Sequence, residues 1–320
     1  MTSAVIGTDF AAAFNPGLAI PLPEVRQWRI HIGAHKTATT HLQETLTTIR
    51  SRLVARGVDP IPLGAVRAAG LAQALNERRI ATRLPILRGV IAKRLLSEIL
   101  DPLREGPETV VLSEEKLMGA PRKVFSDPFY PMVEHIVPTL ATLGGKADVT
   151  LFLSIRGFAA QLASTYAQEL RVLPPPEGGF DAIRARLVKK PPSWFELAQR
   201  IRKAAPTTPL RVWRQEDYRD HKREILSELV GCDTGALPEI KDPLRTKSPS
   251  LEAIREAEAL PRNLSAEERR RTVDAIFASA GPGTRFQPFS KEEITLFQEN
   301  YDADMKRMDE LDPEMRMRFN

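Results

Sequence analysis

The chain has 320 residues, of which 42% are hydrophobic, and a formal net charge of +5. Its length allows one large core or two modest ones, and its 46 basic and 41 acidic residues form a mixed surface that suits a small anionic ligand better than nucleic acid. No stretch approaches the ~20 apolar residues of a membrane-spanning helix, and no cluster of cysteine and histidine indicates a metal site.

Residues 1–24 and the single cysteine bear on location. The first segment lacks a basic start, and polar residues interrupt its apolar stretch, so it is a poor signal peptide. We interpret it as an N-terminal extension. Cys232 is the only cysteine, so no internal disulfide can form, and a small buried hydrophobe is its expected role. These features lead us to expect a cytoplasmic protein.

The first predicted unit is a strand, a loop and a helix. Residues 26–34, RQWRIHIGA, alternate as a strand does and end in a glycine and an alanine. From Thr40 onward apolar residues recur at helical spacing, and Gly57 stands where a helix would end. Between the two elements lies the string GAHKTATT, Gly33 to Thr40.

Strands and helices alternate along the rest of the chain. The patterns predict helix over 71–104 with a break at Pro85, a strand within 108–117, helix around 130–143, a strand over 147–158, a helix to about Leu170, a small basic helix before 191, a helix capped by Ser193, a strand over 209–214, a helix through Val230, and helices over 231–320 with a capping box at 290–293. We expect a single domain over 25–320, with a core at 26–230 and a mainly helical portion at 231–320.

This alternation predicts an α/β fold, in which a parallel β-sheet carries helices on both faces. Ligands of such sheets bind outside the carboxyl ends of the strands. Three segments rich in polar residues fall at predicted strand ends, namely 33–40, 113–115 and 154–156. We expect the functional site where these segments meet.

The string from Gly33 to Thr40 has the features of a phosphate-binding loop. It is not a Walker A loop, because Gly33 and Lys36 are three positions apart and no second glycine precedes the lysine. Backbone N–H groups at the start of the helix would still bind one anionic group, and Lys36 adds a positive charge. The loop therefore suits one phosphate with a terminal anion better than a triphosphate chelated by magnesium.

On these residues the chain resembles the sulfotransferase family whose sulfate donor is 3′-phosphoadenosine 5′-phosphosulfate, and HIGAHKTATTHLQ is most similar to bacterial, carbohydrate-type members. The resemblance implies a P-loop-like sulfotransferase fold and a reaction without metal. The family's usual glycine is Ala38 here, and an alanine would strain the turn if this position needs a positive φ. The residues that the resemblance places around the 5′-phosphosulfate are Gly33, His35, Lys36, Thr37, Ala38, Thr39 and Thr40.

A second motif of the family matches the segment SIRGFAAQLASTY. The family holds the 3′-phosphate of the donor with an arginine at a strand end and a serine eight residues later, which correspond to Arg156 and Ser164. Eight residues of helix span ~12 Å, so both side chains reach one phosphate only if Arg156 lies in the loop between strand and helix. The apolar strand that ends at Leu153 places it there. An ion pair is the alternative for a lone arginine.

The acids after the middle strand are the candidate bases. Carbohydrate-type relatives tend to carry S-x-E here, which makes Glu115 the base that takes the proton of the acceptor, a role worth ~10²–10⁴-fold in rate. Strand alternation allows only one of the two acids to face the donor, and Glu114 is the alternative. Either could instead be an acid at a helix N-terminus. His35 is a further candidate base, and Lys36 would stabilise the charge on the leaving oxygen.

The resemblance implies transfer of a sulfuryl group to a hydroxyl or an amine, with a carbohydrate or glycoconjugate as the expected acceptor. Two alternatives stay open. A P-loop kinase for a small molecule would need a triphosphate loop and a metal-binding aspartate at a strand end. A sulfotransferase-like protein without turnover would bind the donor but transfer nothing.

Two further segments have open roles. We look for acceptor contacts in the loop region 171–192, because loops on a rigid scaffold carry specificity. The segment 245–248, with Arg245, Lys247 and Ser248, either closes over the donor or is a plain loop before a helix capped by Ser250. Within the first segment, the basic residues that we expect to meet an anionic or polyhydroxyl acceptor are Arg184, Arg186, Lys189 and Lys190.

Overall fold

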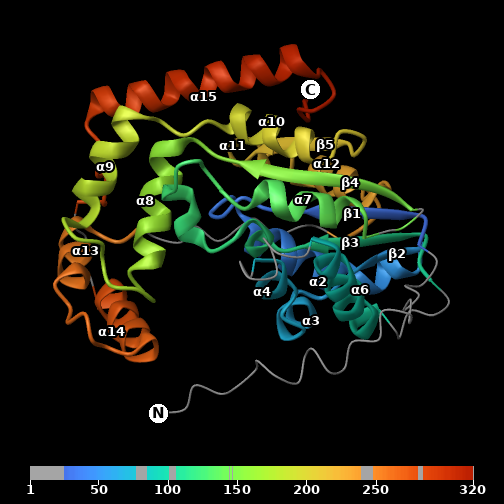
Figure 1. Cartoon of the computed structure of the whole chain (residues 1–320), viewed down its shortest axis with the longest axis horizontal. Helices are drawn as coiled ribbons and strands as arrows, with labels where there is room; N and C mark the ends of the chain where they lie inside the picture. The colour runs from blue at the N-terminus through green and yellow to red at the C-terminus, as the bar shows by residue number, and fades with distance from the viewer. Residues whose placement is uncertain are drawn as a thin grey trace.

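The computed structural model describes residues 25–76, 85–100, 106–143, 145, 147–238, 248–279 and 284–319. Its centre is a parallel sheet with helices packed against both faces, and helices dominate the C-terminal part (Figure 1). The predicted α/β fold is therefore confirmed. The extension at 1–24 and the residues Arg245 and Lys247 lie outside the described residues.

The first strand lies in the middle of the sheet. The order of the strands is β2-β3-β1-β4-β5, and every pair is parallel. The chain thus passes to one side of β1 for β2 and β3, and to the other side for β4 and β5. In a sheet with this reversal, ligands bind at the carboxyl end of the strand where the order turns, which is β1 here. The strands are β1 Gln27–His31, β2 Val58–Pro60, β3 Thr109–Ser113, β4 Asp148–Ile155 and β5 Leu210–Arg214.

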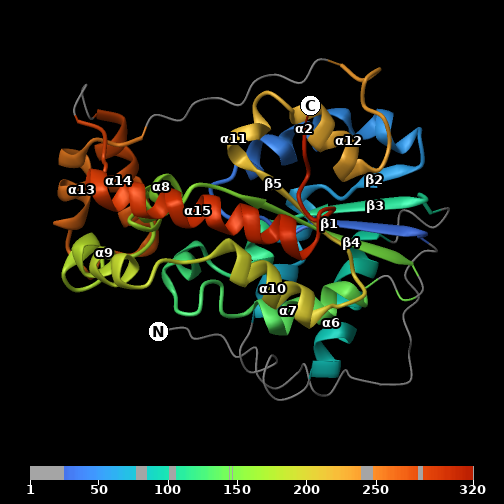
Figure 2. The same ribbon diagram turned by 90° about the horizontal axis from the view of Figure 1, so that it is seen from above.

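Alternation along β1 divides the core into two clusters. Trp28 and Ile30 join the larger cluster, on the face covered by α6, α7 and α10. The opposite face carries Phe152 of β4 and Trp213 of β5, which pack against α2 and α12. Figure 2 shows the strands between these two layers. The covering helices are α2 Thr39–Val54, α6 Pro85–Leu100, α7 Val133–Ala141, α10 Trp194–Ala204 and α12 Lys222–Val230.

Further helices lie beyond the carboxyl ends of the strands (Figure 2). The first, α8, continues from β4, and the long α15 crosses over both α10 and α8 (Figure 1). The predicted capping box at Ser290 and Glu293 is present at the start of α15, and Phe297, Tyr301 and Met305 on its inner side are buried. These helices are α8 Phe158–Glu169, α9 Gly179–Lys189, α13 Leu251–Glu258, α14 Ala266–Ser279 and α15 Lys291–Leu311.

Short elements account for most differences from the predictions. The strand β2 and the helix α3 were not predicted, because three residues that end in Pro60 show no alternation and α3 has less than two turns. The predicted helix before Val230 consists of two helices, α11 and α12. The short helices are α3 Leu63–Ala68, α4 Leu71–Asn76, η2 Glu115–Met118, η3 Pro121–Phe125 and α11 Gln215–Tyr218.

The C-terminal tail runs beside the edge strand β5. The backbone N–H of Val212 donates to the carbonyl of Met315 at 2.7 Å, and the N–H of Met317 donates to the carbonyl of Val212 at 2.8 Å. The tail thereby covers backbone groups that an open edge would leave unpaired. Across the described ranges, every helix is too short or too polar to span a lipid bilayer.

Candidate functional site

The carboxyl ends of β1, β3 and β4 bring the three predicted segments together. His31 at the end of β1 is paired with Ser113 of β3 and with Phe152 of β4. The loop from Gly33 to Ala38 follows β1 and leads into α2. The sheet order therefore places this loop between the acids after β3 and Arg156 after β4.

The loop is tightly constrained. A Cβ atom at Gly33 would lie 2.8 Å from Cβ of Glu115, so only glycine allows the acid to pack this closely. Lys36 and Ala38 have φ values of 64° and 65°, a conformation that is strained for residues other than glycine. The predicted strain at Ala38 is therefore present. Tyr130, with a φ of 49°, is the only other such residue outside glycine in the described chain, and it contacts the same loop.

Helix α2 begins without a cap. Its N-cap residue is Ala38, whose side chain makes no capping hydrogen bond. In the described part of the chain, the backbone N–H groups of Ala38, Thr39 and Thr40 donate to no acceptor. A free helix N-terminus of this kind attracts an anion through its N–H groups and its dipole.

Lys36 is the cation of this loop. It is half-buried, and its ammonium forms no hydrogen bond or ion pair with any described residue. Burial lowers the pKa of Lys36 from its ordinary value, and the positive charges of Arg171 and Arg156 lower it further. Glu115 acts in the opposite direction. An unpaired ammonium in the field of two guanidinium groups favours an anionic partner.

A polar chain beneath the loop fixes its position on the sheet. Thr37 Oγ1 donates to the carbonyl of Ala34 at 2.6 Å, so Ser154 Oγ, 2.5 Å away, donates to Thr37. His31 Nε2 must then donate to Ser154 at 3.0 Å, and its Nδ1 accepts from Ser113 at 2.9 Å. Burial lowers the pKa of His31 to about 3, so the ring is neutral. The hydroxyl of Thr37 therefore points into the protein rather than toward a ligand.

Two carbonyls of the loop are held by side chains from the α8 region. Arg156 Nη1 donates to the carbonyl of Lys36 at 2.9 Å, and Gln161 Nε2 donates to the carbonyl of His35 at 3.1 Å. On the other side, the N–H of His35 donates to the hydroxyl of Tyr130 at 3.2 Å. These contacts turn the carbonyls of the loop toward α8.

His35 itself is a neutral, buried ring. Its Nδ1 lies 3.0 Å from the hydroxyl of Tyr130. This hydroxyl also accepts from the backbone N–H of His35, so the backbone and the ring of His35 both contact it. Burial lowers the pKa of His35 to about 3, which makes the ring a weak base. Among the described residues, Nε2 has no hydrogen-bond partner.

Arg156 lies between the end of β4 and the start of α8, as predicted. Its carbonyl accepts from Trp194 Nε1 at 2.9 Å, and the next N–H, of Gly157, donates to Glu216 at 2.9 Å. Glu216 also accepts from Tyr301 of α15 at 3.0 Å. Ser164 of α8 is half-buried. Arg156 is thus fixed from both sides of its backbone, while most of its guanidinium atoms remain free for a ligand.

The two acids after β3 differ in their surroundings. Glu114 is fully buried, accepts from Arg67 Nε at 2.7 Å and caps η2 by accepting from Lys116 N at 3.0 Å. Glu115 is partly exposed and accepts from Arg67 at 3.1 Å and from Gln43 Nε2 at 3.0 Å. Both carboxylates contact Arg67, but only Glu115 lies against Gly33 of the loop. The strand ends at Ser113, so its alternation no longer applies.

Several residues of the segments 171–192 and 245–250, where we looked for ligand contacts, bond to other residues of the protein instead. Ser250 caps α13 by accepting from Ala253 N at 3.1 Å, as its alternative role predicted, and Ser248 is exposed. Arg184 pairs with Glu293 at 2.8 Å. Arg186 donates to a backbone carbonyl, and Lys190 pairs with Asp127. Lys189 is exposed on α9.

Four residues of the site were not found by sequence reasoning: Arg67, Tyr130, Gln161 and Arg171. Arg67 lies on α3, a helix too short to predict. Tyr130 and Arg171 lie outside regular elements and reach the loop only through the tertiary fold. Gln161 had a usable signal, because it is a polar residue on the buried side of α8.

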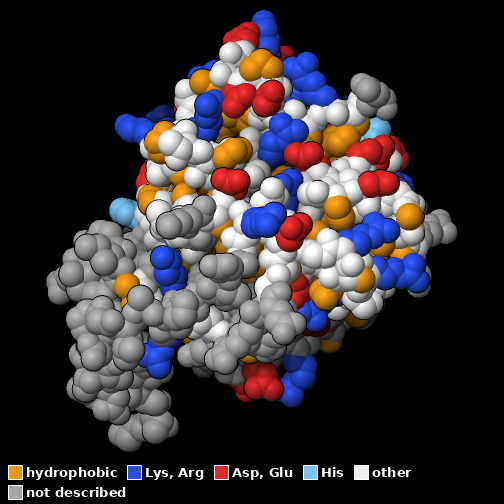
Figure 3. Space-filling view, turned by 90° about the vertical axis from the view of Figure 1, so that its right-hand side faces the viewer, with side chains coloured by type: hydrophobic (Ala, Val, Ile, Leu, Met, Phe, Trp, Pro, Cys, Tyr) orange, Lys and Arg blue, Asp and Glu red, His pale blue; other side chains and the backbone are white. Residues whose placement is uncertain are grey.

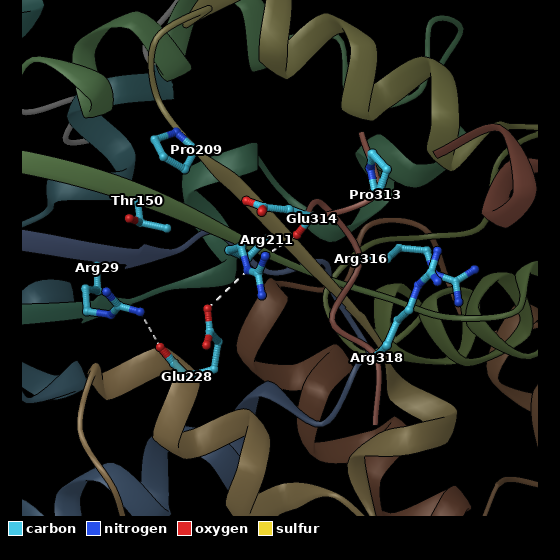
Figure 4. Close-up of a pocket in the computed structure, with 9 residues that line it drawn as sticks. All are labelled: Arg29, Thr150, Pro209, Arg211, Glu228, Pro313, Glu314, Arg316 and Arg318. Carbon is cyan, nitrogen blue, oxygen red and sulfur yellow. Dashed lines mark hydrogen bonds and ion pairs between the residues drawn. The ribbon is translucent and has the colours of Figure 1, made fainter. Parts of the chain in front are cut away.

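A cavity of about 580 Å³ lies at the opposite end of the sheet (Figure 4). Its arginines already have partners within the protein, since Arg211 pairs with Glu228 at 3.1 Å, Arg316 and Arg318 share Asp309 at 3.2 Å, and Arg29 donates to the backbone carbonyls of Leu229 and Glu228. Basic and acidic side chains are also interspersed on the face shown in Figure 3. We therefore assign no anion site there. The lining residues are Arg29, Thr150, Pro209, Arg211, Glu228, Pro313, Glu314, Arg316 and Arg318.

The described residues include no group of three or more His, Cys, Asp or Glu side chains arranged to hold a metal ion. Comparisons with known proteins add no relative, because no protein-family model and no curated protein matches the chain.

Proposed function

We propose that the protein is a sulfotransferase that uses 3′-phosphoadenosine 5′-phosphosulfate and acts on a hydroxyl or an amine of a carbohydrate or glycoconjugate. The main support is Lys36, an unpaired ammonium in a strained loop at the uncapped start of α2. The second support is Arg156, which lies beside this loop and contacts the carbonyl of Lys36. Together they offer two cations to a ligand with two anionic ends.

Each residue has a distinct part in this proposal. The N–H groups of Ala38, Thr39 and Thr40 bind the 5′ end of the donor, and Arg156 with Ser164 binds its 3′-phosphate. The acceptor oxygen forms a bond to sulfur as the bond from sulfur to the bridging oxygen breaks. Lys36 stabilises the negative charge on that oxygen. Glu115 takes the proton of the acceptor, and the products are a sulfate ester and adenosine 3′,5′-bisphosphate.

The position of Glu115 supports its part as the base. It packs against Gly33 and contributes to the electrostatic surroundings of Lys36, so a proton acceptor lies next to the loop. Glu114, in contrast, is enclosed by Arg67 and the backbone of η2. His35 is a poor alternative base, since its pKa of about 3 leaves it little affinity for a proton. A cytoplasmic location is part of the same proposal.

A binding protein without turnover is the second candidate. The observation that favours it is the pair of donors, Arg67 and Gln43, that already engage the carboxylate of Glu115. A base engaged in this way must exchange a hydrogen bond before it accepts a proton. This candidate binds the donor and transfers no sulfate to any acceptor.

The test is transfer of labelled sulfate from the donor to acceptors in a cell extract. We expect transfer by the wild type and its loss in Lys36→Ala, because the leaving oxygen then has no counter-charge. Arg156→Ala should weaken donor binding by roughly 10–100-fold, the range for a charge-assisted contact to phosphate. Lys203→Ala, which removes an exposed lysine of α10, is the matched control.

The outcomes separate the candidates. Donor binding without transfer supports the inactive binding protein. Thermal stabilisation by ATP with magnesium, and none by adenosine 3′,5′-bisphosphate, supports a kinase and refutes the proposal. Wild-type transfer by Lys36→Ala refutes the assignment of this lysine.

A further inference from the structure

The strained backbone of the loop is held by three contacts from outside it. Gln161 donates to the carbonyl of His35, Arg156 donates to the carbonyl of Lys36, and Tyr130 accepts from the N–H of His35, at 3.1, 2.9 and 3.2 Å. All three side chains come from elements remote in sequence from the loop. They are therefore able to set its conformation through the tertiary fold.

An anion site needs its carbonyls turned away, because a carbonyl oxygen repels an anion while an N–H group attracts it. In this loop the carbonyls of His35 and Lys36 are turned away from the anion site and accept from Gln161 and Arg156. The N–H groups of Ala38 and Thr39, which donate to no described acceptor, follow them. The left-handed conformation at Lys36 and Ala38 allows this arrangement and costs ~1–2 kcal/mol per residue. Such strain persists only where the surroundings over-determine the backbone.

Tyr130 has the rigidity that this role requires. It is fully buried, has a φ of 49° and stacks on the ring of His35 with a centroid distance of 5.9 Å. Its own carbonyl accepts from Arg200 at 3.1 Å, and Arg200 pairs with Glu134. The hydroxyl of Tyr130 is therefore fixed by a second layer of contacts, independent of the loop.

Gln161, like Tyr130, is a buried residue that holds the loop by a hydrogen bond. It is fully buried on α8, and its amide nitrogen donates to the loop. Neither Gln161 nor Tyr130 is exposed, so neither touches a ligand directly. Their effect on a ligand must pass through the backbone of the loop.

We propose that Tyr130 and Gln161, together with Arg156, are positioning residues that hold the loop in its anion-binding conformation. They direct the carbonyls of His35 and Lys36 toward α8, and the N–H groups at the start of α2 then converge with the ammonium of Lys36. The inference rests on the proposed function only for the identity of the ligand as a phosphosulfate. The positioning role of these three residues applies to any compact anion that the loop binds.

The test removes one contact at a time. Tyr130→Phe deletes only the hydroxyl, and Gln161→Met keeps the volume of the side chain while it deletes the donor. Thr165→Val is the control, because Thr165 is fully buried on the same helix and its hydroxyl bonds to no described residue. Calorimetry measures the affinity for adenosine 3′,5′-bisphosphate and for inorganic pyrophosphate, a minimal mimic of two linked tetrahedral anions.

We expect Tyr130→Phe and Gln161→Met to weaken both probes by roughly 5–10-fold, the effect of one hydrogen bond. Thr165→Val should change neither by more than about 2-fold. Adding Ala38→Gly to Gln161→Met should restore most of the lost affinity, since glycine adopts a positive φ without support. A role in general packing would not produce this rescue.

Unchanged affinities in folded Tyr130→Phe and Gln161→Met overturn the inference, and so does an equal loss in Thr165→Val without rescue by glycine. A wild type that binds neither probe overturns it as well. The wild type could bind pyrophosphate but not the bisphosphate, while Tyr130→Phe and Gln161→Met bind pyrophosphate more weakly than the wild type does. In that case the inference stands and the proposed function fails.

Discussion

Two neighbouring glutamates at the end of β3 show how one position changes the role of a side chain. Glu114 has no exposed surface, while the side chain of Glu115 is 14% exposed. Arg67 contacts both, but with two hydrogen bonds to Glu114 and one to Glu115. The first acid is buried in the fold, and the second lies beside the loop, where the proposed reaction needs a proton acceptor.

This difference predicts that the same substitution, glutamate to glutamine, affects mainly stability at position 114 and mainly the reaction rate at position 115. Glu114→Gln should lower the free energy of unfolding by about 2–3 kcal/mol, because it removes a buried charge that accepts two hydrogen bonds from the partly exposed Arg67. Glu115→Gln should lower it by less than about 1 kcal/mol, as expected for a partly exposed pair, but should reduce kcat by ~10²–10⁴-fold. Chemical denaturation and sulfate transfer measure the two quantities. A stable Glu114→Gln that loses transfer would reverse the assignment.

At the scale of elements, long periodic segments were predictable. The strand with the apolar run that ends at Leu153 and the helix capped by Ser193 were both found, because alternation and capping are local signals. The place of Arg156 followed from the end of its strand. The predicted strand ends also placed the loop and the two acids at the same edge of the sheet.

The missing parts of the site have no such local signal. The positive φ of Lys36 and the contact between Tyr130 and His35 depend on how distant segments pack. The same holds for Arg67, whose helix is short, and for the inward turn of the hydroxyl of Thr37. Sequence reasoning therefore identified the residues that we propose to face the ligand better than those that hold them.

The C-terminal helix α15 also supports the site through α10. Asp304 of α15 accepts from Ser193 Oγ at 2.8 Å and from Trp194 N at 2.7 Å, at the start of α10. Trp194 in turn donates to the carbonyl of Arg156 at 2.9 Å. A line of direct contacts thus connects the C-terminal helix to the cation that follows β4.

Asp304→Ala should therefore destabilise the protein and weaken donor binding together. It leaves the N–H of Trp194 buried without its acceptor, a change of about 2–3 kcal/mol in the free energy of unfolding. Asp302→Ala, at an exposed position of the same helix, should change it by less than about 0.5 kcal/mol. Denaturation curves and calorimetry test both effects. Equal stabilities of the two variants would show that α15 is not anchored in this way.

At the scale of the whole molecule, the site is built around histidines that are buried in neutral form. His31 joins β1 to β3 and β4 through serine hydroxyls, and His35 joins the loop to Tyr130. Burial lowers the pKa of each from 6.5 to about 3. Protonation of either ring would place an uncompensated charge in the core.

These pKa values predict a loss of stability in mild acid. The unfolded chain binds protons at these histidines below pH 6.5, and the folded chain does so only near pH 3. The unfolded state therefore gains protons first as the pH falls, and the free energy of unfolding falls with it. Each histidine contributes a loss of about 2 kcal/mol between pH 7 and pH 5. Above pH 6.5 this contribution to stability is fully present.

The measurement compares denaturation curves at pH 7 and pH 5 for the wild type and for His35→Gln. The variant should lose about 2 kcal/mol less than the wild type over this interval, because one of the two buried histidines that take up a proton on unfolding is gone. Thr165→Val, a buried substitution that removes no titratable group, should leave the difference between the two pH values unchanged. An equal loss in His35→Gln and the wild type would mean that the ring of His35 takes up its proton as readily in the folded chain as in the unfolded one, and the neutral, buried partner of Tyr130 would be ruled out.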